Sequence, residues 1–319
     1  MKYVKLQNIE IPTIAMGTWS WGIGINGGNQ VFGNEYNEED LRPVFKKAME
    51  KGFNLWDTAA VYGMGASETI LGTLMKEEKD VLISTKFTPF EEQAESAMKE
   101  SLDGSMERLE INSIDIYWIH NPKNVEQWTK EIIPLVKCGK IKHVGVSNHN
   151  LEEITLAASI LEKEGLRLSA VQNHYSLLYR ASEEAGILDW CYKNDVVFFS
   201  YMVLEQGALS SKYNVNNPFK SGTRRGEVFH VDVLRKLEGL IDVMSQIGKK
   251  YQAEPAQIAI AWAISKGTVP IIGVTKESHI DGAVSALNIN LEIDEMIKLE
   301  EAARNTGISI KGGWEKSMI

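Results

Sequence analysis

Residues 142–161 read KHVGVSNHNLEEITLAASIL, and this stretch combines two patterns that together indicate the fold. The first, Lys142–Ser147, is a short apolar run with the length of a strand buried on both faces. The second, Leu151–Leu161, has apolar residues at the i, i+3, i+4 and i+7 spacing of an amphipathic helix, and Asn150 before it is a typical N-cap. The stretch therefore predicts a strand followed closely by a helix.

The same alternation recurs along the whole chain. Eight buried strands separated by helices imply a parallel sheet, which is either an open doubly wound sheet or a closed (β/α)8 TIM barrel. The count of eight favours the barrel, and because no Pro-, Ser- or Gly-rich linker divides the chain, we expect residues 1–319 to form a single domain. The eight runs are Thr13–Gly17, Phe53–Asp57, Val81–Lys86, Ile114–His120, Lys142–Ser147, Ser169–Asn173, Val196–Tyr201 and Val269–Gly273.

Three segments fall outside this repeat. Lys2–Pro12 has the pattern of a two-stranded hairpin turning at Gln7–Asn8, and we expect it to plug the bottom of the barrel. The long gap between the seventh and eighth runs accommodates a loop, Tyr213–Val228, and extra helices rather than a second domain. The C-terminal residues Asn305–Ile319, which include Trp314, are either a flap near the site or a packed arm, and the sequence leaves both open.

Composition excludes several functional classes. The chain has 43 acidic and 34 basic side chains and a net charge of −9, whereas nucleic acids and anionic membranes require a basic surface. Two cysteines cannot supply a disulfide framework, and the six histidines show no metal-ligand spacing. No signal peptide or run of roughly 20 apolar residues is apparent. We therefore expect a cytoplasmic protein that binds a small molecule and no nucleic acid, membrane or metal.

One glycine motif resembles a nucleotide site in form only. Gly22-x-Gly24-x-x-Gly27 matches the dinucleotide fingerprint, which functions where a strand turns directly into a helix. Here the glycines continue into a polar stretch up to Tyr36 before any helical pattern. The motif therefore predicts a long loop after the first strand.

Four reactive side chains lie at or near the ends of three consecutive predicted strands: Asp57 with Tyr62 in the following loop, then Lys86, then His120. In barrels these strand ends meet at one mouth, where active sites are found. Each residue taken singly has a structural alternative, but their joint occurrence favours a catalytic set. A buried lysine needs a partner, which Asp57 supplies. A cation beside Tyr62 is expected to lower the phenol pKa and make Tyr62 a proton donor at neutral pH.

The later strands end in different chemistry. Ser147-Asn148 and Gln172 offer amide and hydroxyl groups that suit a carboxamide. Tyr201 precedes a loop, Leu204–Lys212, that fits a diphosphate. The eighth strand ends in Ile272–Lys276 and opens a helix, whose N-terminus is a natural anion site.

Short motifs spread over nearly the whole chain occur in the order of one known family. They are Gly17-Thr18-Trp19, Asp57-Thr58-Ala59 with Tyr62-Gly63 and Ser67-Glu68, Ser84-Thr85-Lys86, Ile119-His120-Asn121-Pro122, Gly145-Val146-Ser147-Asn148, Gln172-Asn173 and Gly207-Ala208-Leu209. With these residues the chain resembles the aldo-keto reductase family. The resemblance implies a barrel that binds NADP(H) across its mouth and reduces aldehydes or ketones. It implies that Tyr62 is the general acid, that Lys86 and Asp57 tune it, and that His120 orients the substrate carbonyl.

The resemblance also implies nicotinamide contacts, and the residues at the strand ends and in the loops indicate further cofactor and substrate contacts. Ser147, Asn148 and Gln172 would hold the nicotinamide carboxamide, and Tyr201 would stack on the ring. The expected cofactor contacts are Thr18, Trp19, Asp57, Ser147, Asn148, Gln172, Tyr201, Leu204, Gln206, Gly207, Leu209, Lys212, Gly273, Val274, Thr275, Lys276 and His279. The expected substrate contacts, whose rings suit an apolar or ring-containing carbonyl compound or a sugar, are Trp19, Trp21, Tyr62, Trp118, His120 and Trp314.

Two places depart from the family pattern. The loop after Tyr201 begins Met202-Val203-Leu204 where the family usually has Ser-Pro-Leu, and after the eighth strand His279, Gly282 and Ala283 stand where the family has an Arg and a Glu-Asn pair.

We expect NADP(H) rather than NAD(H), because Thr275 and Lys276 lie where a helix N-terminus already favours a phosphate. Glu277 in the same turn opposes this preference, and the alternative for Lys276 is an exposed residue at the helix start.

Two other functions fit parts of the pattern. Some aldo-keto reductase-like chains are channel subunits that bind the nucleotide and turn over slowly. A barrel glycosidase would use paired carboxylates such as Asp57 and Glu205, but it leaves Lys86, Tyr62 and the amide-rich strand ends unexplained. The substrate and the oligomeric state stay open.

Overall fold

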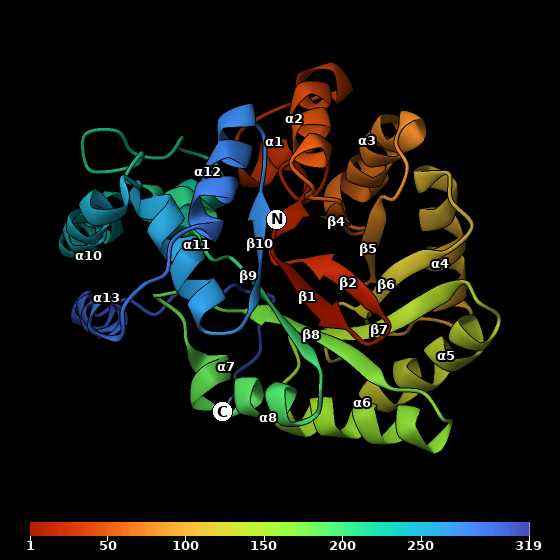
Figure 1. Cartoon of the computed structure of the whole chain (residues 1–319). Helices are drawn as coiled ribbons and strands as arrows, with labels where there is room; N and C mark the ends of the chain where they lie inside the picture. Colours follow the sequence, from red (N-terminus) through yellow and green to blue (C-terminus); the bar gives the residue numbers. More distant parts are fainter. Residues whose placement is uncertain (319) are drawn as a thin grey trace.

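The computed structural model describes residues 1–318, and its centre is a closed barrel of eight parallel strands surrounded by helices (Figure 1). The strand order around the barrel is β10-β3-β4-β5-β6-β7-β8-β9, so neighbours in sequence are neighbours in space. This confirms the barrel over an open sheet. The strands are β3 (Ala15–Gly17), β4 (Leu55–Asp57), β5 (Leu82–Phe87), β6 (Ile114–Ile119), β7 (Ile141–Ser147), β8 (Leu168–His174), β9 (Val197–Tyr201) and β10 (Val269–Gly273).

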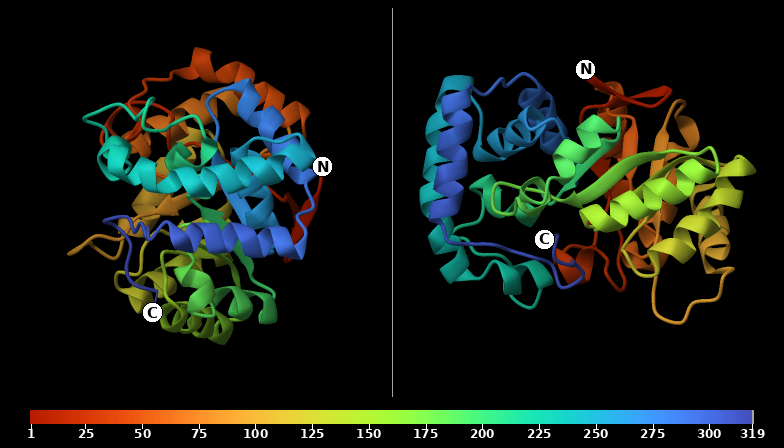
Figure 2. Two further views of the ribbon diagram at one scale, coloured as in Figure 1. Left: turned by 90° about the vertical axis from the view of Figure 1, so that its left-hand side faces the viewer. Right: turned by 90° about the horizontal axis from the view of Figure 1, so that it is seen from below.

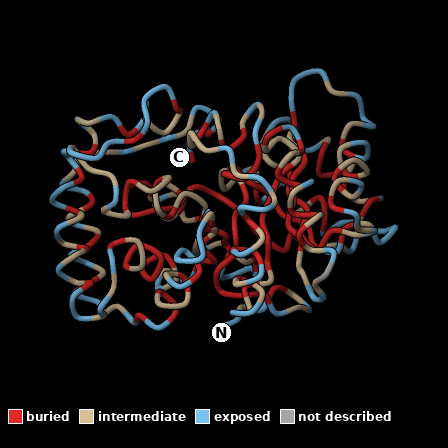
Figure 3. Tube along the Cα trace, turned by 90° about the horizontal axis from the view of Figure 1, so that it is seen from above, coloured by how far each residue is buried: buried red, intermediate tan, exposed pale blue. Residues whose placement is uncertain are grey.

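Amphipathic helices cover the barrel, and buried and exposed residues alternate along each helix as its inner and outer faces recur (Figure 3). In α6, for example, Ile154, Ala157 and Leu161 are buried, and Asn150 and Glu153 form a capping box that satisfies the first turn. The covering helices are α2 (Glu38–Glu50), α3 (Ala66–Leu74), α4 (Ala97–Leu109), α5 (Val125–Lys137), α6 (Leu151–Lys163), α7 (Ala181–Glu184), α8 (Ile187–Lys193), α11 (Pro255–Ser265) and α12 (Glu277–Leu287).

The remaining helices belong to loops and insertions. The gap between β9 and β10 contains α10 (Val231–Tyr251), in agreement with the extra helices expected there. This helix packs against α13 (Ile293–Asn305), which follows β10 and α12. The glycine-rich loop after β3 contains one short helix, α1, which the sequence pattern did not predict. The short helices are α1 (Gly28–Val31), α9 (Arg224–Val228) and the 3-10 turns η1 (Tyr62–Gly65), η2 (Met75–Glu77) and η3 (Glu205–Ser210).

The N-terminal hairpin closes one end of the barrel, which confirms its expected place. Strands β1 (Tyr3–Leu6) and β2 (Ile9–Pro12) pair antiparallel and lie in front of the barrel in Figure 1. Leu6 and Ile11 are fully buried in a cluster that includes barrel-interior side chains such as Trp118. The opposite end of the barrel therefore remains for a ligand.

The C-terminal tail after α13 runs across that opposite end (Figure 2). Glu315 and Met318 are buried, whereas Trp314 is 39% exposed. The tail is therefore packed against the barrel mouth and also presents a ring there, so both interpretations of its sequence hold in part.

Candidate active site

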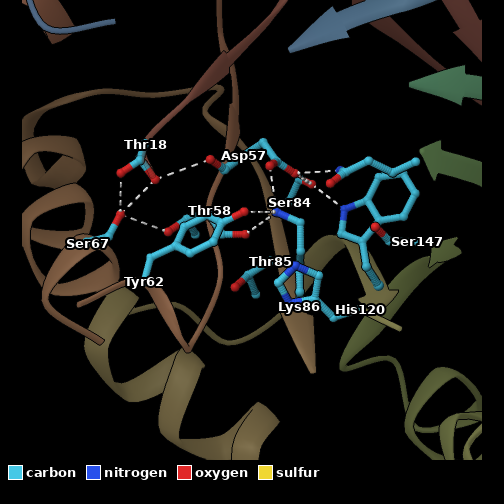
Figure 4. A network of polar contacts seen from close by, with 12 residues as sticks. Thr18, Asp57, Thr58, Tyr62, Ser67, Ser84, Thr85, Lys86, His120 and Ser147 are labelled. Carbon is cyan, nitrogen blue, oxygen red and sulfur yellow. Dashed lines mark hydrogen bonds and ion pairs between the residues drawn. The ribbon is translucent and has the colours of Figure 1, made fainter. Parts of the chain in front are cut away.

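The ends of β4 and β5 place a buried ion pair beneath a phenol (Figure 4). The Lys86 ammonium lies 2.6 Å from Asp57 Oδ2, donates to the Thr58 carbonyl at 2.7 Å and lies 3.4 Å from the Tyr62 hydroxyl. Tyr62 begins the turn η1 in the loop that follows β4, and its hydroxyl lies close to the end of β5 at Lys86. Lys86 is fully buried, and its ammonium lies 5.0 Å from the centroid of the Tyr62 ring.

This arrangement corrects one expectation about acidity. Burial raises the pKa of Tyr62 above 10, and although Lys86 lowers it, the opposing effects of burial and Asp57 prevail. The net direction predicted from the sequence was wrong because the sequence showed the cation but not the degree of desolvation. The pKa of Lys86 is also raised, since Asp57 and Tyr62 outweigh the effect of burial, and Lys86 therefore stays charged.

His120 follows β6 and lies beside the phenol. Its ring centroid is 6.1 Å from that of Tyr62 at a steep angle, and its Nδ1 is 2.8 Å from the Thr88 hydroxyl. Burial lowers the pKa of His120 to about 3, and the charge of Lys86 contributes in the same direction. The imidazole is therefore neutral at physiological pH, with one nitrogen held by Thr88.

Asp57 is itself held by a chain of hydrogen bonds from the barrel interior. Ser84 Oγ and Gln172 Nε2 donate to Asp57 Oδ1 at 2.7 and 3.1 Å. Trp118 Nε1 donates to Ser84 Oγ at 2.5 Å. A Cβ added to Gly145 on β7 would lie 2.2 Å from Trp118 Cε3, so only glycine leaves room for the indole.

Two of the expected substrate contacts are therefore corrected. Trp118 is fully buried inside the barrel, where its indole donates to Ser84 Oγ, which in turn donates to the Asp57 carboxylate. Trp21 is also fully buried, donates to the Val274 carbonyl at 2.7 Å and packs against Trp56. Periodicity could not distinguish these rings from aromatic side chains at the mouth, because both kinds occur at or just after strand ends.

The other aromatic residues do gather at the mouth. Trp19 stacks on Tyr62 with ring centroids 5.8 Å apart, and Trp314 of the tail meets Trp19 edge-on at 5.6 Å. Phe32 covers another edge of Trp19 at 5.3 Å. The phenol therefore lies at the base of an aromatic wall built from three separate segments.

Three strand ends bring together the groups expected around a carboxamide. Asn148 Nδ2 donates to the His120 carbonyl at 2.8 Å and to Ser147 Oγ at 3.2 Å. The Tyr201 hydroxyl bonds to Asn148 Oδ1. Thr18, which follows β3, is buried beside Asp57, with its hydroxyl 3.2 Å from the Asp57 carbonyl oxygen.

The segment after β9 contains several residues with strained backbone conformations. Met202, Glu205, Gln206 and Ser211 all have positive φ, from 47° to 62°, a region that non-glycine residues rarely occupy. Gln206 Oε1 is buried without a partner among the described residues. Of the other expected contacts here, Leu204 and Gly207 are half-buried, Lys212 is exposed and Leu209 is wholly buried.

Cationic groups meet at the start of α12. Lys276 is its N-cap and is exposed, as is Gly273 at the end of β10. The Thr275 backbone donates to His279 Nδ1 at 3.2 Å. Burial lowers the pKa of His279, and the positive charges of Lys276 and Lys212 lower it further.

The family model described as "Aldo/keto reductase family" matches residues 13–304 of this chain. The chain belongs to the aldo/keto reductase family. This aldo/keto reductase is 30% identical to the chloroplastic pyridoxal reductase of Arabidopsis thaliana, over 95% of this chain and 86% of that protein. It is 26% identical to a Schizosaccharomyces pombe aldo-keto reductase named with NADP(+), over 95% and 92%.

A solved structure shows the same fold. The Klebsiella pneumoniae aldo-keto reductase in complex with NADPH aligns with a TM-score of 0.73 and 22% identity, over 98% of this chain and 96% of that one. The reductase is thus an NAD(P)H-dependent oxidoreductase of a family that acts on small carbonyl compounds.

The structure also brings together residues that sequence reasoning missed. Glu205, considered above only as a glycosidase carboxylate, is fully buried and bonds to His174 and Ser176 rather than facing the mouth.

Among residues 1–318, no group of histidine, cysteine and acidic side chains has the arrangement of a metal site. No described helix is long and apolar enough to cross a membrane.

Proposed function

We propose that this aldo/keto reductase reduces an aldehyde or ketone to an alcohol with NADP(H), and that Tyr62 donates the proton. The observation that carries the proposal is the buried Lys86 ammonium, held by Asp57 and 3.4 Å from the Tyr62 hydroxyl. A cation buried under a half-buried phenol has no packing advantage, because desolvating it is costly. Its place fits stabilisation of a phenolate that forms transiently.

The proton transfer follows from the acidities. Tyr62 keeps its proton at neutral pH, since a phenol ordinarily has a pKa of about 10 and the pKa of Tyr62 is raised further. A bound nicotinamide cofactor would supply the hydride, and Tyr62 would donate its proton to the carbonyl oxygen as that oxygen becomes basic. Lys86 then offsets the negative charge left on the phenol oxygen, and Asp57 keeps Lys86 in place. The pair therefore acts mainly in the transition state.

His120 fits the role of orienting the carbonyl. We assign the tautomer in which the Thr88 hydroxyl donates to Nδ1, because Nε2–H is then free to donate to the carbonyl oxygen. A neutral donor positions this oxygen without competing with Tyr62 as the acid, and its low pKa keeps His120 neutral.

The residues of the mouth fit a nicotinamide dinucleotide, which supplies the hydride when bound. Ser147, Asn148 and Gln172 would hold the carboxamide, and Tyr201 would stack on the ring. The segment after β9 would face the diphosphate, where Gln206 Oε1 and the Arg225 Nε are both buried without partners among the described residues. Unsatisfied buried polar atoms of this kind are costly unless a ligand satisfies them.

Lys276, Lys212 and His279 support NADP(H) over NAD(H), because they gather cationic and donor groups where a 2′-phosphate would be bound. The S. pombe relative named with NADP(+) points the same way. For the substrate, the wall of Trp19, Tyr62 and Trp314 favours a carbonyl group on a ring-containing compound. The name of the pyridoxal reductase relative agrees with such a compound.

The test is Tyr62→Phe, assayed by NADPH oxidation over a panel of aldehydes and ketones. We expect kcat/KM to fall by about 10²–10⁴-fold, with the Kd for NADPH nearly unchanged. Tyr192→Phe, at a tyrosine that is 89% exposed, is the matched control and should change neither quantity. Retention of more than about a tenth of kcat/KM by Tyr62→Phe would rule out Tyr62 as the acid. A wild-type enzyme that binds NADPH but reduces no carbonyl would favour the regulatory alternative.

A further inference from the structure

A second buried cluster of charged side chains lies beside Tyr201 and Asn148, the residues proposed to contact the nicotinamide. The proposed reaction does not use this cluster. His174, the last residue of β8, lies between two glutamates: its Nε2 is 2.9 Å from Glu205 Oε1 in η3, and its Nδ1 is 3.0 Å from Glu315 Oε1 in the tail. All three side chains are fully inaccessible to solvent. The cluster joins a strand, a loop and the C-terminus.

The two flanking carboxyl groups fit an imidazole that carries a positive charge. Carboxylates only accept hydrogen bonds, so an imidazole between two of them must donate from both nitrogens. Burial alone would lower the pKa of His174, but Glu205 and Glu315 raise it to about 9. The other groups that face His174 are the rings of Tyr179 and Tyr201, stacked at 4.4 and 5.6 Å.

Glu315 connects the cluster to Tyr201, one of the proposed nicotinamide contacts. Its Oε1 is 3.1 Å from the Tyr201 hydroxyl, which also bonds to Asn148 Oδ1 and lies 3.4 Å from the Trp314 Nε1 donor. The hydroxyl of Tyr201 therefore sits at the junction of the tail and the strand ends. Glu315 is one of the three groups that hold this hydroxyl.

The tail has other anchors, but they are of a different kind. Lys316 forms an exposed ion pair with Glu153 of α6. Trp314 packs on Trp19 and lies under the Arg224 guanidinium at 5.7 Å. Surface contacts of this kind contribute little, whereas a buried carboxylate that loses its partners is strongly destabilising. Near its end the tail is also held by Met318, which is buried and accepts a hydrogen bond from Asn173 Nδ2 at 3.5 Å. The ion pair with His174 is the buried charged anchor at Glu315 itself, next to Tyr201.

We propose that Glu315 is a positioning residue of the nicotinamide site: held by charged His174, it fixes the Tyr201 ring and the Asn148 amide against which the nicotinamide binds. The inference rests on the proposed function, because it takes Tyr201 and Asn148 as nicotinamide contacts. It makes the C-terminal tail part of the cofactor site as well as of the aromatic wall.

The decisive experiment compares two ligands by titration. NADPH contains the nicotinamide, and adenosine 2′,5′-bisphosphate carries only the adenosine end. For Glu315→Gln, which keeps the shape and removes the charge, we expect the Kd for NADPH to rise about ten- to a hundred-fold, the range for a lost charged hydrogen bond. The Kd for the bisphosphate should be unchanged, since a general folding defect would weaken both ligands.

Three further variants keep the test sharp. Lys316→Met removes the neighbouring exposed anchor and should leave both Kd values unchanged. Glu315→Asp retains the charge and should restore part of the NADPH affinity. If Glu315→Gln does not fold, Glu205→Gln replaces it: it removes the other carboxylate from His174 without touching Tyr201, and should weaken NADPH selectively but less.

The pH dependence gives a readout that simple packing would not change. In the wild type the ratio of the NADPH Kd to the bisphosphate Kd should rise as pH passes about 9, where His174 loses its proton. In Glu315→Gln this rise should move to lower pH. Equal NADPH affinity in Glu315→Gln and wild type, or equal weakening of both ligands, would overturn the inference. Failure of the wild type to bind NADPH would instead refute the proposed function.

Discussion

Replacing Lys86 with methionine tests the central ion pair through both stability and catalysis. Methionine matches the length of the lysine stem but leaves the Asp57 carboxylate buried without its cation. Breaking a buried pair from one side typically costs about 3–5 kcal/mol. Asp57 keeps hydrogen bonds from Ser84 and Gln172 in the variant, so we expect the lower end, about 3 kcal/mol of unfolding free energy.

The catalytic loss should be as large as that of removing the acid. Without Lys86 the phenolate has no nearby cation, and burial together with Asp57 then raises the pKa of Tyr62 further. We expect kcat/KM for carbonyl reduction to fall by about 10²–10⁴-fold. Urea unfolding followed by tryptophan fluorescence gives the stability, and NADPH oxidation gives the rate.

Two controls identify the cause. The double variant Asp57→Asn, Lys86→Met leaves no unpaired charge, so it should be more stable than Lys86→Met by at least about 1 kcal/mol while remaining inactive. Lys99→Met breaks an exposed pair with Asp103 and should unfold like the wild type. If Lys86→Met unfolds at the wild-type free energy, or the double variant recovers nothing, the ion pair does not have the role assigned to it.

Three other outcomes are expected. Gly145→Ala puts a Cβ 2.2 Å from the Trp118 ring, so it should cost about 1–3 kcal/mol in urea unfolding and lower kcat, whereas Gly239→Ala, in open space on α10, should not destabilise the protein. Burial, and to a smaller extent the charge of Lys86, holds the pKa of His120 near 3, below its value in the unfolded chain. The free energy of unfolding should therefore decrease as the pH falls from about 6.5 to 3, because only the unfolded chain readily binds the proton. His120→Gln should show a smaller decrease over this range, and a pH profile identical to that of the wild type would contradict this. Lys276→Met should lower the NADPH-to-NADH ratio of kcat/KM by about ten- to a hundred-fold; equal use of both cofactors by the wild type would refute the assignment of Lys276.

The alternation of strand and helix patterns along the sequence predicted both the barrel and the shared end at which Asp57, Lys86 and His120 lie, for one physical reason. Parallel strands joined by helices must all run the same way, so their carboxyl ends meet at one mouth. Asp57, Lys86 and His120 could therefore be placed together before any contact was known. The eight predicted runs differ from the observed strands by at most two residues at either end.

Burial and long-range contact depended on the tertiary structure. The sequence positions of Trp118 and Trp19 both fit an aromatic side chain at the mouth. In the structure Trp118 instead lies inside the barrel, where Gly145 leaves room for its ring because it has no side chain. The sign of the Tyr62 pKa shift depended on how far desolvation outweighs the Lys86 charge, which no spacing encodes.

The His174 cluster shows the same limit most clearly. Glu205 and Glu315 are 31 and 141 residues from His174 in sequence, and nothing local marks either as its partner. The chain alone determined which strands end in reactive groups, because backbone periodicity is local. The packing of loops and tail decided which charges share a dry site, because the free energy of a buried charge depends on every group that surrounds it.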